Sequence, residues 1–193
     1  MSTRRIPWQD GRWSHPPVAQ HSEGDALVAT AAEGSDAWRT TSYGFLHDSE
    51  HALLAPIVQD SAVEVTFIAA FAEQFDQAGV FLRAAGGAWL KAGVEFADGV
   101  PQLGAVVTHG RSDWSVAPVP EWAGRRVTVR ASWADDAVTV RARVDDDAFR
   151  LVRVAPWVDE PTEAGPFLCA PTRPGLEVRF TDWRVTTADA SLH

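Results

Sequence analysis

The sequence predicts an all-β protein, a sandwich of two packed antiparallel sheets. Short β-rich segments recur along the 193 residues, and Gly and Pro separate them at the spacing that is typical of sandwiches and barrels. The sequence has no long run with the apolar periodicity of an amphipathic helix. Because the length suits one all-β domain, we expect residues 1–193 to form a single domain with its core at about residues 8–186.

Alternating apolar side chains predict the individual strands. In the segment 63–71, Val63, Val65 and Phe67 share one face with Ala69 and Phe71, because side chains two apart on a strand point the same way. Further strands are predicted at 27–30, 38–43, 78–83, 89–96, 103–108, 149–154, 176–180 and 183–186. Segments 127–133 and 138–144 should pair as a hairpin across Asp135-Asp136. These segments amount to about ten to twelve strands, enough for two packed sheets.

Charge and composition exclude several kinds of partner. The formal net charge is −9, and an acidic surface repels both the phosphates of nucleic acids and anionic membranes. Cys169 is the only cysteine, so no internal disulfide can form, as expected in a reducing compartment. The first residues lack the apolar segment of a signal peptide, and no apolar run reaches the length of a membrane span. We therefore expect a cytoplasmic protein that binds neither nucleic acid nor membrane.

The segment Trp89-Leu90-Lys91-Ala92-Gly93-Val94-Glu95 predicts a site. On a strand, its even-numbered apolar residues face the core, while Trp89, Lys91 and Glu95 share the opposite face. Side chains two apart lie about 6.6 Å from each other, so an aromatic ring, an ammonium group and a carboxylate form a row. Gly93 leaves a gap in this row where a ligand can approach the backbone.

Several sequence blocks in a fixed order resemble a known family. They are Asp36-Ala37-Trp38-Arg39-Thr40, Tyr43-Gly44-Phe45 with Asp48 and His51, Glu73-Gln74-Phe75-Asp76-Gln77-Ala78-Gly79, Trp89 to Glu95, Val106-Val107-Thr108 with Ser112-Asp113-Trp114-Ser115, and Gly165-Pro166 with Ala170-Pro171 and Gly175-Leu176. From about Trp8 to Val185 the chain resembles the YesU-like, regulation-of-enolase family of uncharacterised proteins. The resemblance implies a jelly roll of the concanavalin A-like lectin/glucanase superfamily and brings no established activity with it.

The first functional hypothesis is a carbohydrate-binding groove on the concave face of the sandwich. Sugars have polar rims and C–H groups on their faces, so they need hydrogen-bonding side chains beside aromatic rings. The candidate ligand-binding residues are Trp38, Asp76, Gln77, Trp89, Lys91, Glu95, Asp113 and Trp114. The alternative is structural: Lys91 pairs with Glu95 or Asp76 to hold the sheet, because buried charges persist only when they are paired.

Two other functions stay open at this stage. A glycoside hydrolase needs two facing carboxylates, and Glu95 with Asp113 or Asp76 could supply them. The sequence has no Glu-x-Asp-x-x-Glu pattern, which on one strand places nucleophile and acid on the same face and which related β-glucanases carry. The regulatory naming of the family suggests a protein-interaction module as the third function.

We expect no metal and no cofactor. His47 and His51 are four residues apart, but no helix start and no third ligand accompany them, so His51 is expected to be a hydrogen-bonding residue packed near Tyr43. The partner that we expect is a small carbohydrate or oligosaccharide, and a homodimer stays open.

Overall fold

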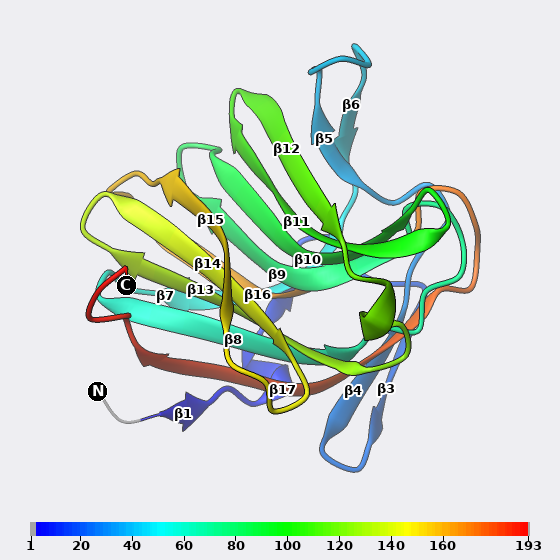
Figure 1. The fold of residues 1–193 in the computed structure, drawn as a ribbon, viewed down its shortest axis with the longest axis horizontal. Coiled ribbons are helices and arrows are strands. Elements are labelled where there is room, and N and C mark those ends of the chain that lie inside the picture. The colour runs from blue at the N-terminus through cyan, green and yellow to red at the C-terminus, as the bar shows by residue number, and fades with distance from the viewer. Residues whose placement is uncertain (1–2, 193) are drawn as a thin grey trace.

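The two predicted sheets are present in the computed structural model, which describes residues 3–192. The larger sheet is antiparallel, and β1 (Arg4–Arg5) pairs beside its strand β17. Its strand order is β15 (Arg150–Pro156), β14 (Ala137–Val144), β13 (Arg126–Ala134), β8 (Ser61–Ile68), β17 (Glu177–Thr187), β4 (Ala26–Thr30) and β3 (Ala19–Glu23). Figure 1 shows the chain ending at the side of the sandwich where β1 begins.

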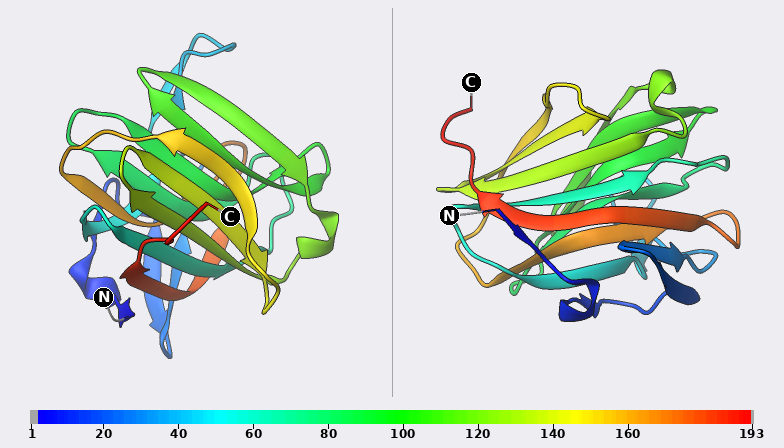
Figure 2. Two further views of the ribbon diagram at one scale, coloured as in Figure 1. Left: turned by 60° about the vertical axis from the view of Figure 1, so that its left-hand side comes forward. Right: turned by 90° about the horizontal axis from the view of Figure 1, so that it is seen from below.

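The second sheet has seven strands, and it carries the face on which the predicted site lies. Its order is β12 (Arg111–Pro118), β11 (Val100–His109), β10 (Trp89–Ala97), β9 (Gln77–Ala84), β16 (Thr162–Cys169), β7 (His51–Ile57) and β2 (Arg12–Trp13). A separate hairpin of β5 (Ala37–Arg39) and β6 (Leu46–Asp48) stands out from the sandwich near β12 (Figures 1 and 2). Short 3-10 helices cover Trp8–Asp10 and Pro120–Trp122.

The main core fills the space between the two sheets. Val63, Val65 and Phe67 of β8 face inward, as their alternation predicts, and are fully buried. The even-numbered apolar residues of β10 meet them from the seven-stranded sheet. Burying apolar area in this way is the dominant favourable term in folding. Within residues 3–192, four buried tryptophans belong to this core: Trp122, Trp133, Trp157 and Trp183.

A row of glycines crosses the seven-stranded sheet. Gly93 of β10 pairs with Gly79 of β9 on one side and with Gly104 of β11 on the other. A Cβ atom on Gly93 would lie 2.1 Å from the carbonyl oxygen of Ala78, so the strands approach too closely for any side chain there. Glycines at such positions allow a sheet to bend, and the row leaves the outer face bare between Lys91 and Glu95.

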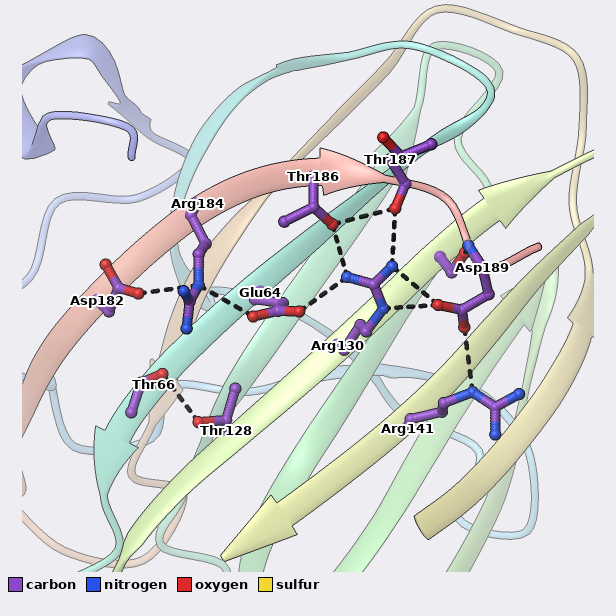
Figure 3. A network of polar contacts seen from close by, with 11 residues as sticks. Glu64, Thr66, Thr128, Arg130, Arg141, Asp182, Arg184, Thr186, Thr187 and Asp189 are labelled. Atoms are coloured by element: carbon purple, nitrogen blue, oxygen red, sulfur yellow. Dashed lines mark hydrogen bonds and ion pairs between the residues drawn. The ribbon is translucent and has the colours of Figure 1, made fainter. Parts of the chain in front are cut away.

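An ion network holds the outer face of the larger sheet (Figure 3). Arg130 on β13 bonds to Glu64 on β8 at 2.8 Å and to Asp189 at 2.8 Å. Arg184 on β17 reaches the second oxygen of Glu64 at 3.0 Å, and Arg141 on β14 reaches the second oxygen of Asp189 at 3.1 Å. The network therefore joins four strands to the C-terminal segment.

Some predicted elements differ from the structure. Residues 112–115 lie outside every predicted strand but belong to edge strand β12. The predicted segments 176–180 and 183–186 are one strand, β17, with a bulge between Phe180 and Asp182. The predicted strand count was too low, because short or edge strands such as β2, β3, β6 and β12 were missed together with β7 and β16. Within residues 3–192, no helix is long and apolar enough to cross a membrane.

Candidate functional site

A cavity of about 250 Å³ lies between the outer face of the seven-stranded sheet and the β5–β6 hairpin. Its lining residues are Asp36, Trp38, Tyr43, Phe45, Phe75, Gln77, Lys91, Glu95, Val106 and Trp114. A hollow of about 20 Å³ continues from it along Gly93 and Gly104 and has room for about one water-sized group. Lys91 and Glu95 share the predicted face, and the gap left by Gly93 lies between them.

The floor of the cavity is an ion pair. The Lys91 ammonium donates to Asp36 Oδ1 at 2.7 Å and to Gln77 Oε1 at 2.8 Å. Burial is the largest single influence and opposes the charged form of Lys91, but the surrounding acidic groups, Asp36 first among them, together outweigh burial and hold the pKa of Lys91 above its ordinary value. The expected ion network therefore exists, although the partner is Asp36 and neither Glu95 nor Asp76.

Glu95 is the polar group of the cavity that lacks a partner. Its Oε1 oxygen is buried and has no hydrogen-bond partner in the described part of the chain. Burial raises the pKa of Glu95 to about 7, and the nearby Lys91 charge opposes this rise only in part. A buried acceptor without a donor costs about 1–3 kcal/mol, so this oxygen is ready to accept a hydrogen bond from a ligand.

Aromatic rings form the wall opposite this floor. The Trp38 ring lies 6.3 Å from Trp114 and 5.7 Å from Tyr43, in both cases edge to face. Tyr43 stacks on Phe45 at 5.3 Å. The Trp38 indole donates to the carbonyl of Thr41, which fixes the ring against its own hairpin. Trp114, Tyr43 and Phe45 are still 38%, 58% and 43% exposed, so this wall is open to solvent on one side.

Asp76 does not reach the cavity. Its carboxylate is fully buried and accepts hydrogen bonds from Arg173 at 2.6 Å and from the backbone N–H groups of Ala72 and Glu73 at 3.1 Å. Burial alone would raise its pKa, but these bonds hold the pKa of Asp76 below its ordinary value. Asp76 therefore orders the loop before β9, and its predicted role in ligand binding or catalysis is wrong on geometry.

Asp113 lies on the face of β12 that points away from the cavity. Its pairing partner Val107 faces the main core, whereas Trp114 pairs with Val106, which lines the cavity. The Asp113 carboxylate accepts a hydrogen bond from Arg153 of the other sheet at 2.7 Å. Neither hydrolase pair proposed from the sequence, Glu95 with Asp113 or Glu95 with Asp76, can therefore face one substrate.

Trp89 has the predicted orientation but not the predicted exposure. Its ring is 6% exposed and stacks on Phe81 at 5.6 Å. It belongs to a second apolar cluster, which covers the outer face of the seven-stranded sheet beneath the hairpin. Trp89 therefore packs within this cluster and does not line the cavity. The ring that could stack on a ligand at this site is Trp114.

Residues 13–188 match the family described as "Protein of unknown function (DUF1349)". The chain belongs to the DUF1349 family. A relative from Saccharomyces cerevisiae, "Regulation of enolase protein 1", is 34% identical over 190 residues, which cover 96% of this chain and 94% of the yeast protein. The family resemblance inferred from the sequence blocks is thus confirmed.

Solved structures confirm the DUF1349 chain as a β-sandwich of this type. A functionally unknown protein from Saccharomyces cerevisiae superimposes with a TM-score of 0.89 at 32% identity, over 96% of this chain and 100% of that one. A bifunctional GH43-CE protein from Bacteroides eggerthii gives 0.68 at 14% identity, over 94% of this chain and 24% of that one. An engineered GH43 glycoside hydrolase gives 0.71 at 13% identity, over 97% and 41%. The last two show similarity of fold alone.

The sequence did not single out five lining residues of the DUF1349 chain as site residues: Asp36, Tyr43, Phe45, Phe75 and Val106. Three of them precede or join the strands of the hairpin, whose position over the sheet depends on tertiary contacts such as the bond from Arg39 N–H to Ser112 Oγ at 2.9 Å. Their presence in the blocks that carry the family resemblance was the available signal.

His51 is a hydrogen-bonding residue, as expected. It is buried, its Nε2 accepts from the Ala32 N–H, and its Nδ1 contacts the His15 carbonyl. Burial lowers the pKa of His51, which agrees with a neutral ring that has one donor and one acceptor nitrogen. Among residues 3–192, no group of three or more His, Cys, Asp or Glu side chains is arranged to hold a metal ion.

Proposed function

We propose that this DUF1349 chain binds a small carbohydrate in the cavity beneath the β5–β6 hairpin. The observation that carries the proposal is the pairing of an aromatic wall with a polar floor that ends in the unpartnered Glu95 carboxyl group. A sugar ring has both an apolar face and hydroxyl donors, so it complements both surfaces. The volume of about 250 Å³ is near the lower end of small-molecule pockets, about 300 Å³, and favours one or two sugar units.

The fold of the solved neighbours adds support by association. Structures named as GH43 glycoside hydrolases contain a sandwich of this kind, but one fold hosts many functions. We propose binding rather than hydrolysis, because a two-carboxylate mechanism needs a second carboxylate free to act. The one other carboxylate among the cavity lining, Asp36, is committed to Lys91.

The test is calorimetric titration with a panel of monosaccharides and short oligosaccharides, followed by Trp114→Ala. Trp114 lines the cavity from an edge strand, and stacking of aromatic rings is worth about 0.5–1.5 kcal/mol. We expect Trp114→Ala to weaken binding about two- to tenfold without loss of fold. Trp13→Ala is the matched control, because Trp13 lies on β2 outside the cavity lining. Equal affinity of the wild type and Trp114→Ala for the best sugar would contradict the proposed site.

A protein-interaction role is the second candidate. The hairpin exposes Tyr43, Phe45 and Leu46, the last by 67%, and exposed apolar patches mark interaction sites. The yeast relative carries "Regulation of enolase" in its name. On this reading the chain binds enolase and ignores sugars, so titration with purified enolase of the same organism separates the two candidates.

A further inference from the structure

The charged groups of the cavity do not balance. Two carboxylates, Asp36 and Glu95, face one ammonium group, that of Lys91. Lys91 is engaged with Asp36 and Gln77, and no ion pair joins it to Glu95 within the described residues. An ionised Glu95 therefore carries a negative charge that has no ion-pair partner among residues 3–192, although the nearby Lys91 charge offsets it in part.

The geometry directs this charge toward a ligand. Glu95 lines both the cavity and the small hollow over Gly93, and its buried Oε1 oxygen lacks a donor. The burial that raises the pKa of Glu95 to about 7 disfavours the ion only while it is unpaired. A cation bound beside it would lower that pKa again, and a charge-assisted hydrogen bond is about twice as strong as a neutral one.

The aromatic wall favours the same ligand charge. Trp38, Tyr43 and Trp114 surround the space above the floor, and ring faces attract ammonium groups within about 6 Å. A uronate carboxylate would instead meet two acids and a lysine that is already paired. The site thus disfavours anionic sugars. Its charged and aromatic groups favour a cationic sugar over a neutral one.

We infer that the cavity prefers an amino sugar, whose protonated amine donates to Glu95 Oε1 while its ring packs against Trp114. This inference rests on the proposed function and specifies its ligand class. The hollow of about 20 Å³ over Gly93 is large enough for a group of the size of an ammonium.

The test compares matched sugars on the intact protein by calorimetry at about pH 7, where Glu95 is near half ionisation. The probes are glucose, glucosamine and N-acetylglucosamine, with the galactose series alongside. We expect the amino sugar to bind about tenfold more tightly than its hydroxyl counterpart. Acetylation keeps the nitrogen and removes the charge, so it should abolish the preference. This comparison needs no variant protein.

Glu95→Gln then identifies the residue responsible. The variant should bind the amino sugar and the neutral sugar within about twofold of each other, because the charge is lost while the shape is kept. Retained neutral-sugar binding also shows that it folds. Glu163→Gln is the control: Glu163 lies on the same sheet face but pairs with Arg12 and Arg83 outside the cavity, so the preference should persist.

The outcomes separate the two proposals. If sugars bind with no amine preference, or if Glu95→Gln keeps the preference, the amino-sugar inference is wrong and the carbohydrate site stands. If no sugar of either kind binds, the proposed function fails and the inference fails with it.

Discussion

Glu95 and Lys91 lie on one strand, but their surroundings favour the charged form of Lys91 and the neutral form of Glu95. They lie four residues apart on the same face of β10, and both are largely buried. Lys91 has a carboxylate at 2.7 Å and keeps its charge. Glu95 has no such partner, and burial raises its pKa to about 7. Burial disfavours the charged form of both side chains. Their different ionisation therefore comes from the ion-pair partner that Lys91 has and Glu95 lacks among the described residues.

This contrast predicts how stability depends on pH. Between the ordinary Glu value of 4.5 and about 7, the folded state holds a proton on Glu95 that the unfolded chain has released. Rising pH therefore favours unfolding through this window, by at most about 3 kcal/mol in total. Glu95→Gln removes the effect, so the variant should gain stability relative to wild type as the pH rises from about 5 to about 8.

Urea denaturation at both pH values measures this gain. Burial also raises the pKa of Glu50, but that residue is common to both proteins and cancels in the difference between them. A difference between wild type and Glu95→Gln that does not change with pH would mean that the folded protein ionises Glu95 normally.

At the scale of elements, the glycine row across β9, β10 and β11 shapes the sheet beneath the cavity. A Cβ atom on Gly93 would lie 2.1 Å from the Ala78 carbonyl oxygen and 2.8 Å from Gly79 Cα. Both are backbone atoms of a paired strand, so no side-chain movement relieves the contact. We expect Gly93→Ala to lower the free energy of unfolding by about 3 kcal/mol or more.

Chemical denaturation measures this loss, and Gly86→Ala is the matched control. The three atoms nearest to a new Cβ atom at Gly86 all belong to the carboxylate of Glu160, which accepts a hydrogen bond from the Gly86 N–H and lies at the end of a flexible side chain. The control should therefore cost less than about 1 kcal/mol. Equal losses for the two variants would show that the strands can separate enough to admit a methyl group.

The elements also show why the sequence predicted some strands and not others. β10 alternates because one of its faces is apolar core and the other is polar cavity floor, and this alternation places Lys91 and Glu95 correctly. β7 and β16 lie under apolar layers on both faces: in β7, Leu53 and Ala55 join the main core while Ala52 and Leu54 join the second cluster. Without a polar face, no alternation marks the strand.

The sequence predicted the row on one strand, and the family blocks added Trp38, Gln77 and Trp114, which also line the cavity. It did not predict which residues pair across the site. The Lys91–Glu95 row follows from a local pattern, whereas the Asp36–Lys91 pair joins residues 55 positions apart. Asp113 was a candidate because it is a polar residue of a family block, in a segment for which no strand was predicted. Its position within β12 turns alternate side chains to opposite faces and directs Asp113 toward Arg153.

Across the whole molecule, the two outer faces of the sandwich differ in the groups that they carry. The face of the seven-stranded sheet carries an apolar cluster and the cavity. The face of the larger sheet carries the ion network, whose far end is the C-terminal segment (Figure 3). Asp189 bonds to Arg130 and Arg141, and its N–H donates to Ser132 Oγ at 2.8 Å. Leu192 O accepts a further bond from Arg141 at 2.7 Å.

The segment after β17 is thus fastened over β13 and β14, and Asp189 is the residue that joins both. Asp189→Ala removes two hydrogen bonds to charged groups at a site where Arg130 is 9% exposed. Such a bond contributes about 1.5–3 kcal/mol. Arg130 retains Glu64 at 2.8 Å, which limits the loss, so we expect a decrease of about 2 kcal/mol in the free energy of unfolding. We also expect faster digestion of the C-terminal residues by carboxypeptidase.

Denaturation and timed digestion together show whether the bonds of the C-terminal segment contribute to the stability of the fold. Asp147→Ala is the control, because Asp147 lies in an exposed turn after β14. Binding at the cavity should be unchanged in both variants, since the main core separates the two outer faces. Unchanged stability and unchanged digestion of Asp189→Ala would show that the bonds of Asp189 to Arg130 and Arg141 do not hold the C-terminal segment.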